Sequence, residues 1–130
     1  MEDLSRRSAR EVLEDHLTIA QRWESEDLEQ VVAEDLRRNV SEDIVILINR
    51  GVFRGHAGVI ELARMLGEEL PEHNAFSYTF KAVEGRVAML EWGYEDATVS
   101  VRDGVDSYVI EDGKIVAQTI HYTLEEKELP

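Results

Sequence analysis

Three ionisable side chains are the candidates for moving protons in this sequence: Asp106, Glu91 and His16. In an apolar cavity, two neighbouring carboxyl groups acquire different pKa values, so that one can act as an acid and the other as a base. A histidine exchanges protons near neutral pH. We therefore predict that Asp106, Glu91 and His16 are the catalytic residues of an acid–base site that needs no cofactor.

Two of these residues also have a purely structural interpretation. Glu91 lies on a predicted strand whose faces are both mixed in polarity, so it could pair with an arginine or reach solvent at the rim. His16 lies at the centre of the apolar stripe of a predicted helix, where it could be a core histidine bonded to a buried carboxylate. The sequence leaves both interpretations open.

Asp106 belongs to a predicted β-hairpin over residues 104–122, and the loop that closes this hairpin decides which side chains share a face. A two-residue turn at Asp112 and Gly113 would place Glu111 opposite Lys114. A three-residue loop with Gly113 in the left-handed region would instead place Ile110 opposite Lys114. We favour the three-residue loop, because glycine suits that conformation.

The three-residue loop divides the hairpin into two faces of different character. One face resembles the wall of a small-molecule pocket and carries Asp106, Tyr108, Ile110, Val116, Gln118, Ile120 and Tyr122. The other carries Ser107, Val109, Ala117, Thr119 and His121, which would meet solvent or a second copy of the chain. With the two-residue turn, His121 would enter the pocket instead.

Aromatic and amide side chains are the candidates for ligand contact. We predict that Trp23, Tyr108, Tyr122, Gln118 and Phe53 bind a planar or hydrophobic molecule. The alternative is that the rings fill the core of a small domain.

The first part of the chain is predicted to be helical. Ser8 and Glu11 have the spacing of a capping box, and apolar residues at helical intervals predict a helix over residues 9–24. Asp27 begins a second helix that we expect to end within residues 33–36.

Strands begin near the middle of the chain. The apolar run 44–49 predicts a strand with two covered faces, and residues 52–54 predict a short return strand. A third helix follows from His56 and is bounded by Gly67 and Pro71.

Beyond Pro71 the apolar period becomes two, which predicts strands over residues 76–81, 86–96 and 99–101, the last continuing into the hairpin. Helices followed by antiparallel strands indicate the α+β class. A strongly bent, mostly antiparallel sheet wrapped around the N-terminal helices would make a cone of the cystatin-like α+β barrel type, with a cavity at its open end.

Length and composition set further bounds. The 130 residues predict one domain with a core at about 9–124 and frayed ends. The formal charge of −14 disfavours nucleic acid and anionic membranes as partners. There is no cysteine, no metal-ligand spacing among the four histidines and no long apolar run, so we expect no metal, no disulfide and a cytoplasmic protein.

Several short motifs occur in the order of a known superfamily. They are Trp23 four residues before Asp27-Leu28-Glu29, then Val52-Phe53-Arg54-Gly55, Gly104-Val105-Asp106 and Asp112-Gly113-Lys114-Ile115-Val116. Over residues 9–124 the chain resembles the cone-shaped superfamily that includes nuclear transport factor 2 (NTF2), ketosteroid isomerases, scytalone dehydratase, limonene epoxide hydrolase and SnoaL-like polyketide cyclases. The resemblance implies the cone fold and places Glu91 in the cavity near Asp106.

The resemblance transfers only one isomerase residue. Asp106 resembles the aspartate that stays protonated in ketosteroid isomerases and donates a hydrogen bond to the developing oxyanion. The general-base aspartate falls at Ile48 or Asn49, and the helical tyrosine falls near Ile19, so that mechanism is not expected here. The paired histidines of scytalone dehydratase and the Asp-Arg-Asp set of the epoxide hydrolase have no counterparts.

The sequence thus predicts a SnoaL-like domain that binds a small hydrophobic or aromatic molecule, as a cofactor-independent isomerase, dehydratase or cyclase. A non-catalytic ligand-binding or dimerisation module is the alternative. In either case we expect a homodimer formed through the outer face of the sheet.

Overall fold

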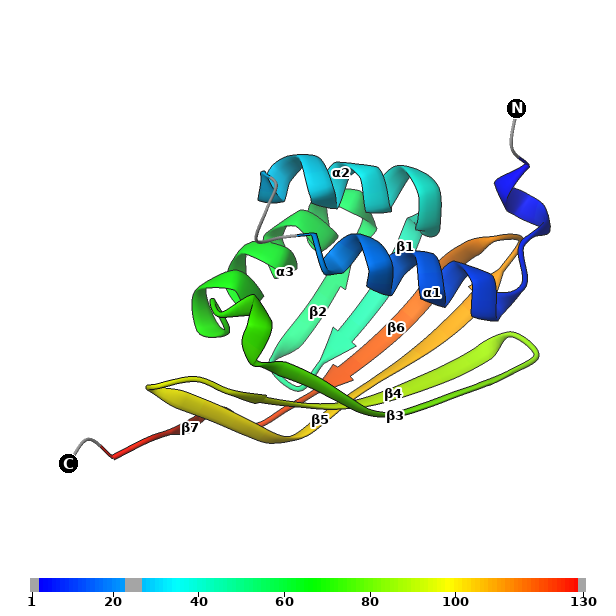
Figure 1. Cartoon of the computed structure of the whole chain (residues 1–130). Coiled ribbons are helices and arrows are strands. Elements are labelled where there is room, and N and C mark those ends of the chain that lie inside the picture. Colours follow the sequence, from blue (N-terminus) through cyan, green and yellow to red (C-terminus); the bar gives the residue numbers. More distant parts are fainter. Residues whose placement is uncertain (1–2, 23–26, 129–130) are drawn as a thin grey trace.

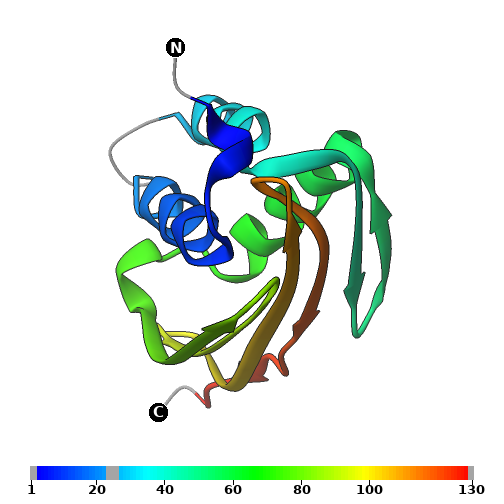
Figure 2. The same cartoon turned by 90° about the vertical axis from the view of Figure 1, so that its right-hand side faces the viewer.

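Three helices lie on the inner side of one curved sheet in this computed structural model, which describes residues 3–22 and 27–128 (Figure 1). The helices are α1 (Ala9–Ala20), α2 (Leu28–Asn39) and α3 (Gly55–Glu69), with short 3₁₀ turns at Leu4–Arg6 and His73–Ala75. The sheet is strongly bent but not closed, and Figure 2 shows it curling around the helices. The predicted α+β cone is confirmed, as an open sheet rather than a closed barrel.

The two N-terminal helices begin where their capping residues predict. The side chain of Ser8 accepts from the backbone of Glu11 and Glu11 reciprocates, which forms the predicted capping box. Asp27 caps α2, which continues to Asn39 rather than ending within residues 33–36. The longer helix is explained by burial, because Leu36 and Asn39 both lie in the interior. The predicted last turn of α1, residues 23–24, lies outside the described residues.

The sheet has the order β2-β1-β6-β5-β4-β3, and β7 adds to the free end of β5. The strands are β1 (Val40–Ile48), β2 (Gly51–Arg54), β3 (Phe76–Glu84), β4 (Val87–Glu95), β5 (Val99–Glu111), β6 (Lys114–His121) and β7 (Glu125–Glu126). Among these described strands, β1 and β6 pair in parallel and the other pairs are antiparallel. The mostly antiparallel sheet is therefore as predicted.

The turn between β5 and β6 differs from the one we favoured. Asp112 and Gly113 both have positive φ, 51° and 74°, and Glu111 pairs with Lys114, so this is a two-residue turn. The three-residue loop was wrong because an aspartate tolerates the left-handed region well enough to share the turn with glycine.

A bulge beside this turn restores the predicted faces. Ile110 pairs with Ile115 but Val109 pairs with Ala117, so Val116 is an extra residue on β6. From there on, Tyr108 pairs with Gln118, which keeps both on the face of Asp106. His121 is therefore exposed on the outer face despite the two-residue turn.

The prediction that β1 has two covered faces is wrong for the single chain. Ile44, Ile46 and Ile48 are buried against the helices, whereas Val45 and Leu47 are 36% and 49% exposed. The continuous apolar run therefore places aliphatic side chains on the uncovered outer face as well.

Segments near both ends of the described chain contact the rest of the fold. The Arg7 guanidinium donates to the carbonyls of Arg38 (2.6 Å) and Gly113 (3.0 Å), which ties the N-terminal segment to α2 and the hairpin. Near the other end, Glu125 and Glu126 pair with β5 as β7. A long-range guanidinium contact and a two-residue strand leave no periodic signal in the sequence.

Gly104 allows the bent strand β5 to pass close to Trp92. Between the Trp92–Gly104 and Tyr94–Val101 pairs, β5 has one more residue than β4, which makes the bulge predicted near Asp103 and Gly104. A Cβ atom at Gly104 would lie 2.4 Å from Cδ2 of Trp92 and 2.7 Å from its carbonyl oxygen. Only glycine fits here without displacing the indole.

Replacing Gly104 with alanine is expected to lower the free energy of unfolding by about 1–3 kcal/mol, because the indole and the strand must shift. Chemical denaturation measures this change. Gly67→Ala is the matched control: it lies in α3 with nothing within 4 Å of an added Cβ, and should raise stability by about 0.5–1 kcal/mol. Equal effects of the two substitutions would contradict the close approach at Trp92.

Candidate functional site

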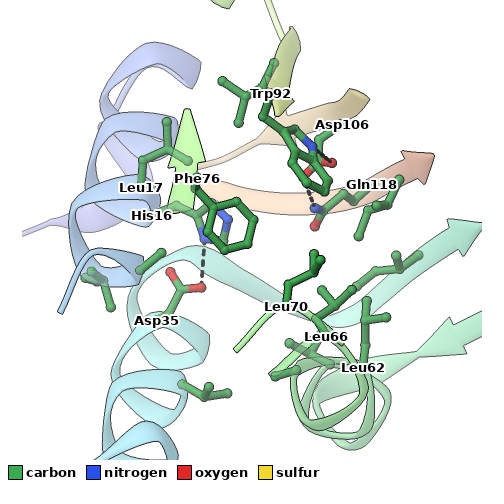
Figure 3. A pocket seen from close by; sticks show the side chains of 18 of the residues that line it. His16, Leu17, Asp35, Leu62, Leu66, Leu70, Phe76, Trp92, Asp106 and Gln118 are labelled. Atoms are coloured by element: carbon green, nitrogen blue, oxygen red, sulfur yellow. Dashed lines mark hydrogen bonds and ion pairs between the residues drawn. The ribbon is translucent and has the colours of Figure 1, made fainter. Parts of the chain in front are cut away.

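A cavity of about 190 Å³ lies between the three helices and the concave face of the sheet (Figure 3). Its walls are mostly aliphatic and aromatic. The apolar lining comes from α1, α2 and α3, from β1, β4 and β6, and from the segment that leads into β3. The polar side chains that face the cavity are His16, Asp35, His73, Tyr78, Asp106, Tyr108 and Gln118. This combination of an apolar wall with a few polar groups is typical of small-molecule sites.

Asp106 accepts hydrogen bonds from three neighbouring side chains. The Trp92 indole donates to Oδ1 (3.0 Å), while the Tyr108 hydroxyl (3.1 Å) and the Gln118 amide (3.3 Å) donate to Oδ2. Burial raises the pKa of Asp106, and this effect exceeds the opposing effects of those three bonds and of His16. The carboxyl group therefore keeps its proton to a higher pH than a solvated aspartate does.

His16 reaches the same cavity from α1 and is paired with Asp35 of α2. Its Nδ1 lies 2.7 Å from Oδ2 of Asp35. Its ring contacts the Tyr108 ring edge-on, with 5.9 Å between the ring centroids. Burial lowers the pKa of His16, but the charges of Asp35, Asp106 and Asp15, together with the Asp35 hydrogen bond, outweigh it and raise the pKa. When the ring is neutral and Nδ1 donates to Asp35, Nε2 is left as the proton acceptor.

Asp35 is itself held in place by a hydrogen-bonded chain. The fully buried Asn39 donates through Nδ2 to Asp35 (2.9 Å) and to Asp15 (2.9 Å), and its Oδ1 accepts from Arg7 (2.9 Å). Arg38 donates to Asp15 at 2.9 Å. The orientation of His16 is therefore fixed by a polar chain that runs from the cavity to the N-terminal segment.

The structure brings two of the three predicted catalytic residues together. Asp106 and His16 line one cavity, and their catalytic role stays a prediction. The predicted placement of Glu91 in the cavity is wrong: it pairs with Val105 and is exposed on the outer face. Leu90 and Trp92 face the cavity instead.

The predicted ligand-binding residues divide in the same way. Tyr108 and Gln118 line the cavity, whereas Phe53 and Tyr122 pack into the core outside it. The Tyr122 hydroxyl donates to Glu69 (3.0 Å), and the Arg50 guanidinium lies over the Tyr122 ring. Trp23 lies outside the described residues.

Sequence reasoning missed Asp35, Tyr78 and His73. Asp35 had a signal, because it lies one helical turn from the buried Val31 and one from Asn39, and therefore on the inner face of α2. Tyr78 and His73 had none, since their positions depend on how β3 and the 3₁₀ turn before it cross the cavity.

Within residues 3–22 and 27–128, no three potential metal-ligating side chains of histidine, aspartate or glutamate come together as a metal site. In the same part of the chain, no helix has the length and apolar character needed to span a bilayer.

The arrangement of the helices and strands identifies the fold. An open, curved sheet with three helices on its concave face is the NTF2-like fold, which SnoaL-like proteins share. No protein-family model matches the sequence, and no curated protein matches it either.

Solved structures match the fold at low sequence identity. An NTF2-like protein of unknown function from Burkholderia xenovorans is 16% identical over 94% of this chain and 87% of its own, with a TM-score of 0.62. A putative isomerase of the SnoaL-like family from Agrobacterium tumefaciens is 16% identical over 83% and 97%, with a TM-score of 0.59. A putative polyketide cyclase from Sinorhizobium meliloti is 15% identical over 68% and 80%, with a TM-score of 0.52.

Substituting Asp35 with asparagine is expected to lower the pKa of His16. The substitution removes the charge that stabilises the imidazolium, while the burial that opposes protonation remains. NMR titration of the His16 ring measures the change. Glu91→Gln removes the same charge from the outer face and should leave this pKa unchanged; equal shifts would contradict the His16–Asp35 pairing.

Proposed function

We propose that this protein binds a small hydrophobic molecule in the cavity and converts it by acid–base catalysis without a cofactor. The observation that carries this proposal is the placement of His16 and Asp106, from different elements, at one mostly apolar cavity. Isomerisation, dehydration and cyclisation each need a group that accepts a proton and a group that donates one. The two side chains fit these roles.

The division of roles follows from the surroundings of each group. His16 offers Nε2 as a base, and Asp35 stabilises the imidazolium that forms when a substrate proton arrives. Asp106, whose pKa is raised by burial, can return a proton or donate a hydrogen bond to an oxygen that becomes negative. In an isomerisation the proton leaves one atom and is restored at another; in a dehydration the leaving hydroxyl takes a proton and departs as water.

The comparisons support the same reaction classes without identifying one. One structural neighbour is named a putative isomerase and another a putative polyketide cyclase. Those names belong to proteins with at most 16% identity to this chain, so the site geometry carries the proposal.

A non-catalytic binding module is the second candidate. It is favoured by the hydrogen bonding of Asp106, whose three donors all come from the protein itself. A carboxyl group held in this way can serve to fix three strands in register without touching a ligand.

The uncovered face of the sheet supports a homodimer. Backbone pairing joins one outer row across the strands from β2 to β3, comprising Val52, Leu47, Thr119, Ser107, Met89 and Ala82. Val52 and Leu47 are each about half exposed, and Val45, Val87 and Phe80 add to the same face. An apolar sheet face of this kind is suited to bind its copy about a two-fold axis.

Filling part of the cavity should reduce the amount of ligand that the protein retains. Ala63 lines the cavity from α3, so Ala63→Leu occupies part of its volume and is expected to reduce bound ligand by roughly tenfold or more. Native mass spectrometry of the purified protein measures the retained ligand. Ala33→Leu adds the same volume on an exposed position of α2 and should retain the ligand like the unmodified chain.

The same preparation separates the two candidate functions. Incubation of the identified ligand with the protein should yield a product of equal mass for an isomerase or cyclase, or of one water less for a dehydratase. An unaltered ligand would favour the binding module. A protein that retains nothing, and binds no added apolar molecule, would contradict both candidates.

A charge on the outer face should disrupt the homodimer. Leu47→Glu places a carboxylate in the outer row between Val52 and Thr119, where pairing of two copies would bury it without a partner. Analytical ultracentrifugation should show a dimer for the unmodified chain and a monomer for this variant. Ala33→Glu, with the same added charge on α2, should remain dimeric, and a monomeric unmodified chain at micromolar concentration would refute the interface.

A further inference from the structure

We propose that the ligand of this cavity is an uncharged or cationic molecule built on a single ring, and that the cavity rejects carboxylates and phosphates. This inference rests on the proposed binding function and adds the chemical class of the ligand. It is carried by the kinds of charged groups that face the cavity, by the way its hydrogen-bond donors are used, and by its volume.

The charged groups at the cavity leave no cation for an anionic ligand. Among the described residues that line it, there is no lysine and no arginine, whereas Asp35 and Asp106 both face it. The one histidine with a raised pKa, His16, already has its charge matched by Asp35 at 2.7 Å. A ligand carboxylate would therefore meet two carboxyl groups and no unmatched positive charge.

Three of the hydrogen-bond donors around the cavity are directed at a carboxyl group of the protein. Trp92, Tyr108 and Gln118 each donate to Asp106. Figure 3 shows Trp92 and Gln118 directed at this carboxyl group. A buried anion needs several donors to replace its lost hydration, and without them its transfer from water is costly. An uncharged ring has no such requirement.

A cation meets favourable groups in the same place. The rings of Phe76 and Trp92 lie 5.5 Å apart in the cavity wall, and Tyr78 lines it beside them. Aromatic faces attract cations, and Asp106 lies next to the Trp92 indole. The site therefore tolerates an ammonium group where it disfavours a carboxylate.

The volume limits the size of the ligand. An engineered cavity of about 150 Å³ binds benzene, whereas pockets for drug-sized molecules measure about 300–1,000 Å³. The cavity here, at about 190 Å³, lies just above the first value. One ring with a short substituent fits within it.

Three probes of equal size and different charge test the inference: benzyl alcohol, benzylamine and benzoate. Near neutral pH these are uncharged, cationic and anionic. Titration followed by the NMR signal of the Trp92 indole N–H, which lies in the cavity wall, should show binding of the first two. Benzoate should bind at least roughly tenfold more weakly than benzyl alcohol.

A matched pair of variants locates the source of the selection. At a pH where the Asp106 carboxyl group is ionised, Asp106→Asn removes a charge at the cavity and should weaken benzylamine binding and strengthen benzoate binding, each by roughly tenfold. Glu91→Gln makes the same change in net charge on the outer face and should leave both affinities unchanged. Circular dichroism establishes that each variant is folded, and the unmodified chain decides the question alone if Asp106→Asn does not fold.

The outcomes distinguish this inference from the function on which it rests. Benzoate binding as tightly as benzyl alcohol would overturn the charge selection and leave a small-molecule site in place. Equal effects of Asp106→Asn and Glu91→Gln would assign the selection to the overall charge of −14 and overturn the role of the cavity carboxyls. If none of the three probes changes the Trp92 signal, the proposed binding function itself is refuted.

Discussion

The structure depends on keeping a carboxyl group hydrogen-bonded in an apolar cavity. A buried acid without partners costs several kcal/mol, so the side chain of Asp106 must find donors wherever the strands place it. The donors come from β4, β5 and β6, one residue from each. Three adjacent strands are thereby fixed in one register, because a shift of one residue would move the donors to the other face. The bulge at Val116 and the close passage of Gly104 past Trp92 are the backbone adjustments that satisfy this requirement.

The helices are positioned by a second polar system on the opposite wall. His16 of α1 and Asp35 of α2 form a pair, and Asn39 connects that pair to Asp15 and Arg7. Each of these groups would lose hydrogen bonds if one helix moved along the other. This hydrogen-bonded system therefore fixes how α1 and α2 lie over the sheet. Apolar packing alone tolerates many arrangements of similar energy. The cavity is therefore bounded by two hydrogen-bonded systems, and the ligand space lies between them.

The elements were more predictable than the directions of individual side chains. Capping at Ser8 and alternation in the strands follow from local rules, and the α+β class follows from their order. The direction of Glu91 did not, because both faces of its strand are mixed and only pairing with β5 decides which side is buried. The predicted face of Asp106 agrees with the structure although the predicted turn was wrong, because the bulge at Val116 compensates for the shorter loop. The partner of His16 depends on how α1 and α2 pack against each other. The spacing of residues along a single sequence does not predict that packing.

The strands β4, β5 and β6 serve two surfaces at once, because their side chains alternate between the cavity and the outer face. A strand that faces water on one side normally shows polar residues there, yet β1 carries valine and leucine on its exposed face. The apolar run that predicted two covered faces is thus explained if the second cover is another copy of the chain. Such a cover would lie on the back of the strands that hold Asp106 and its donors. It would oppose any flattening of the curved sheet, and the cavity owes its shape to that curvature.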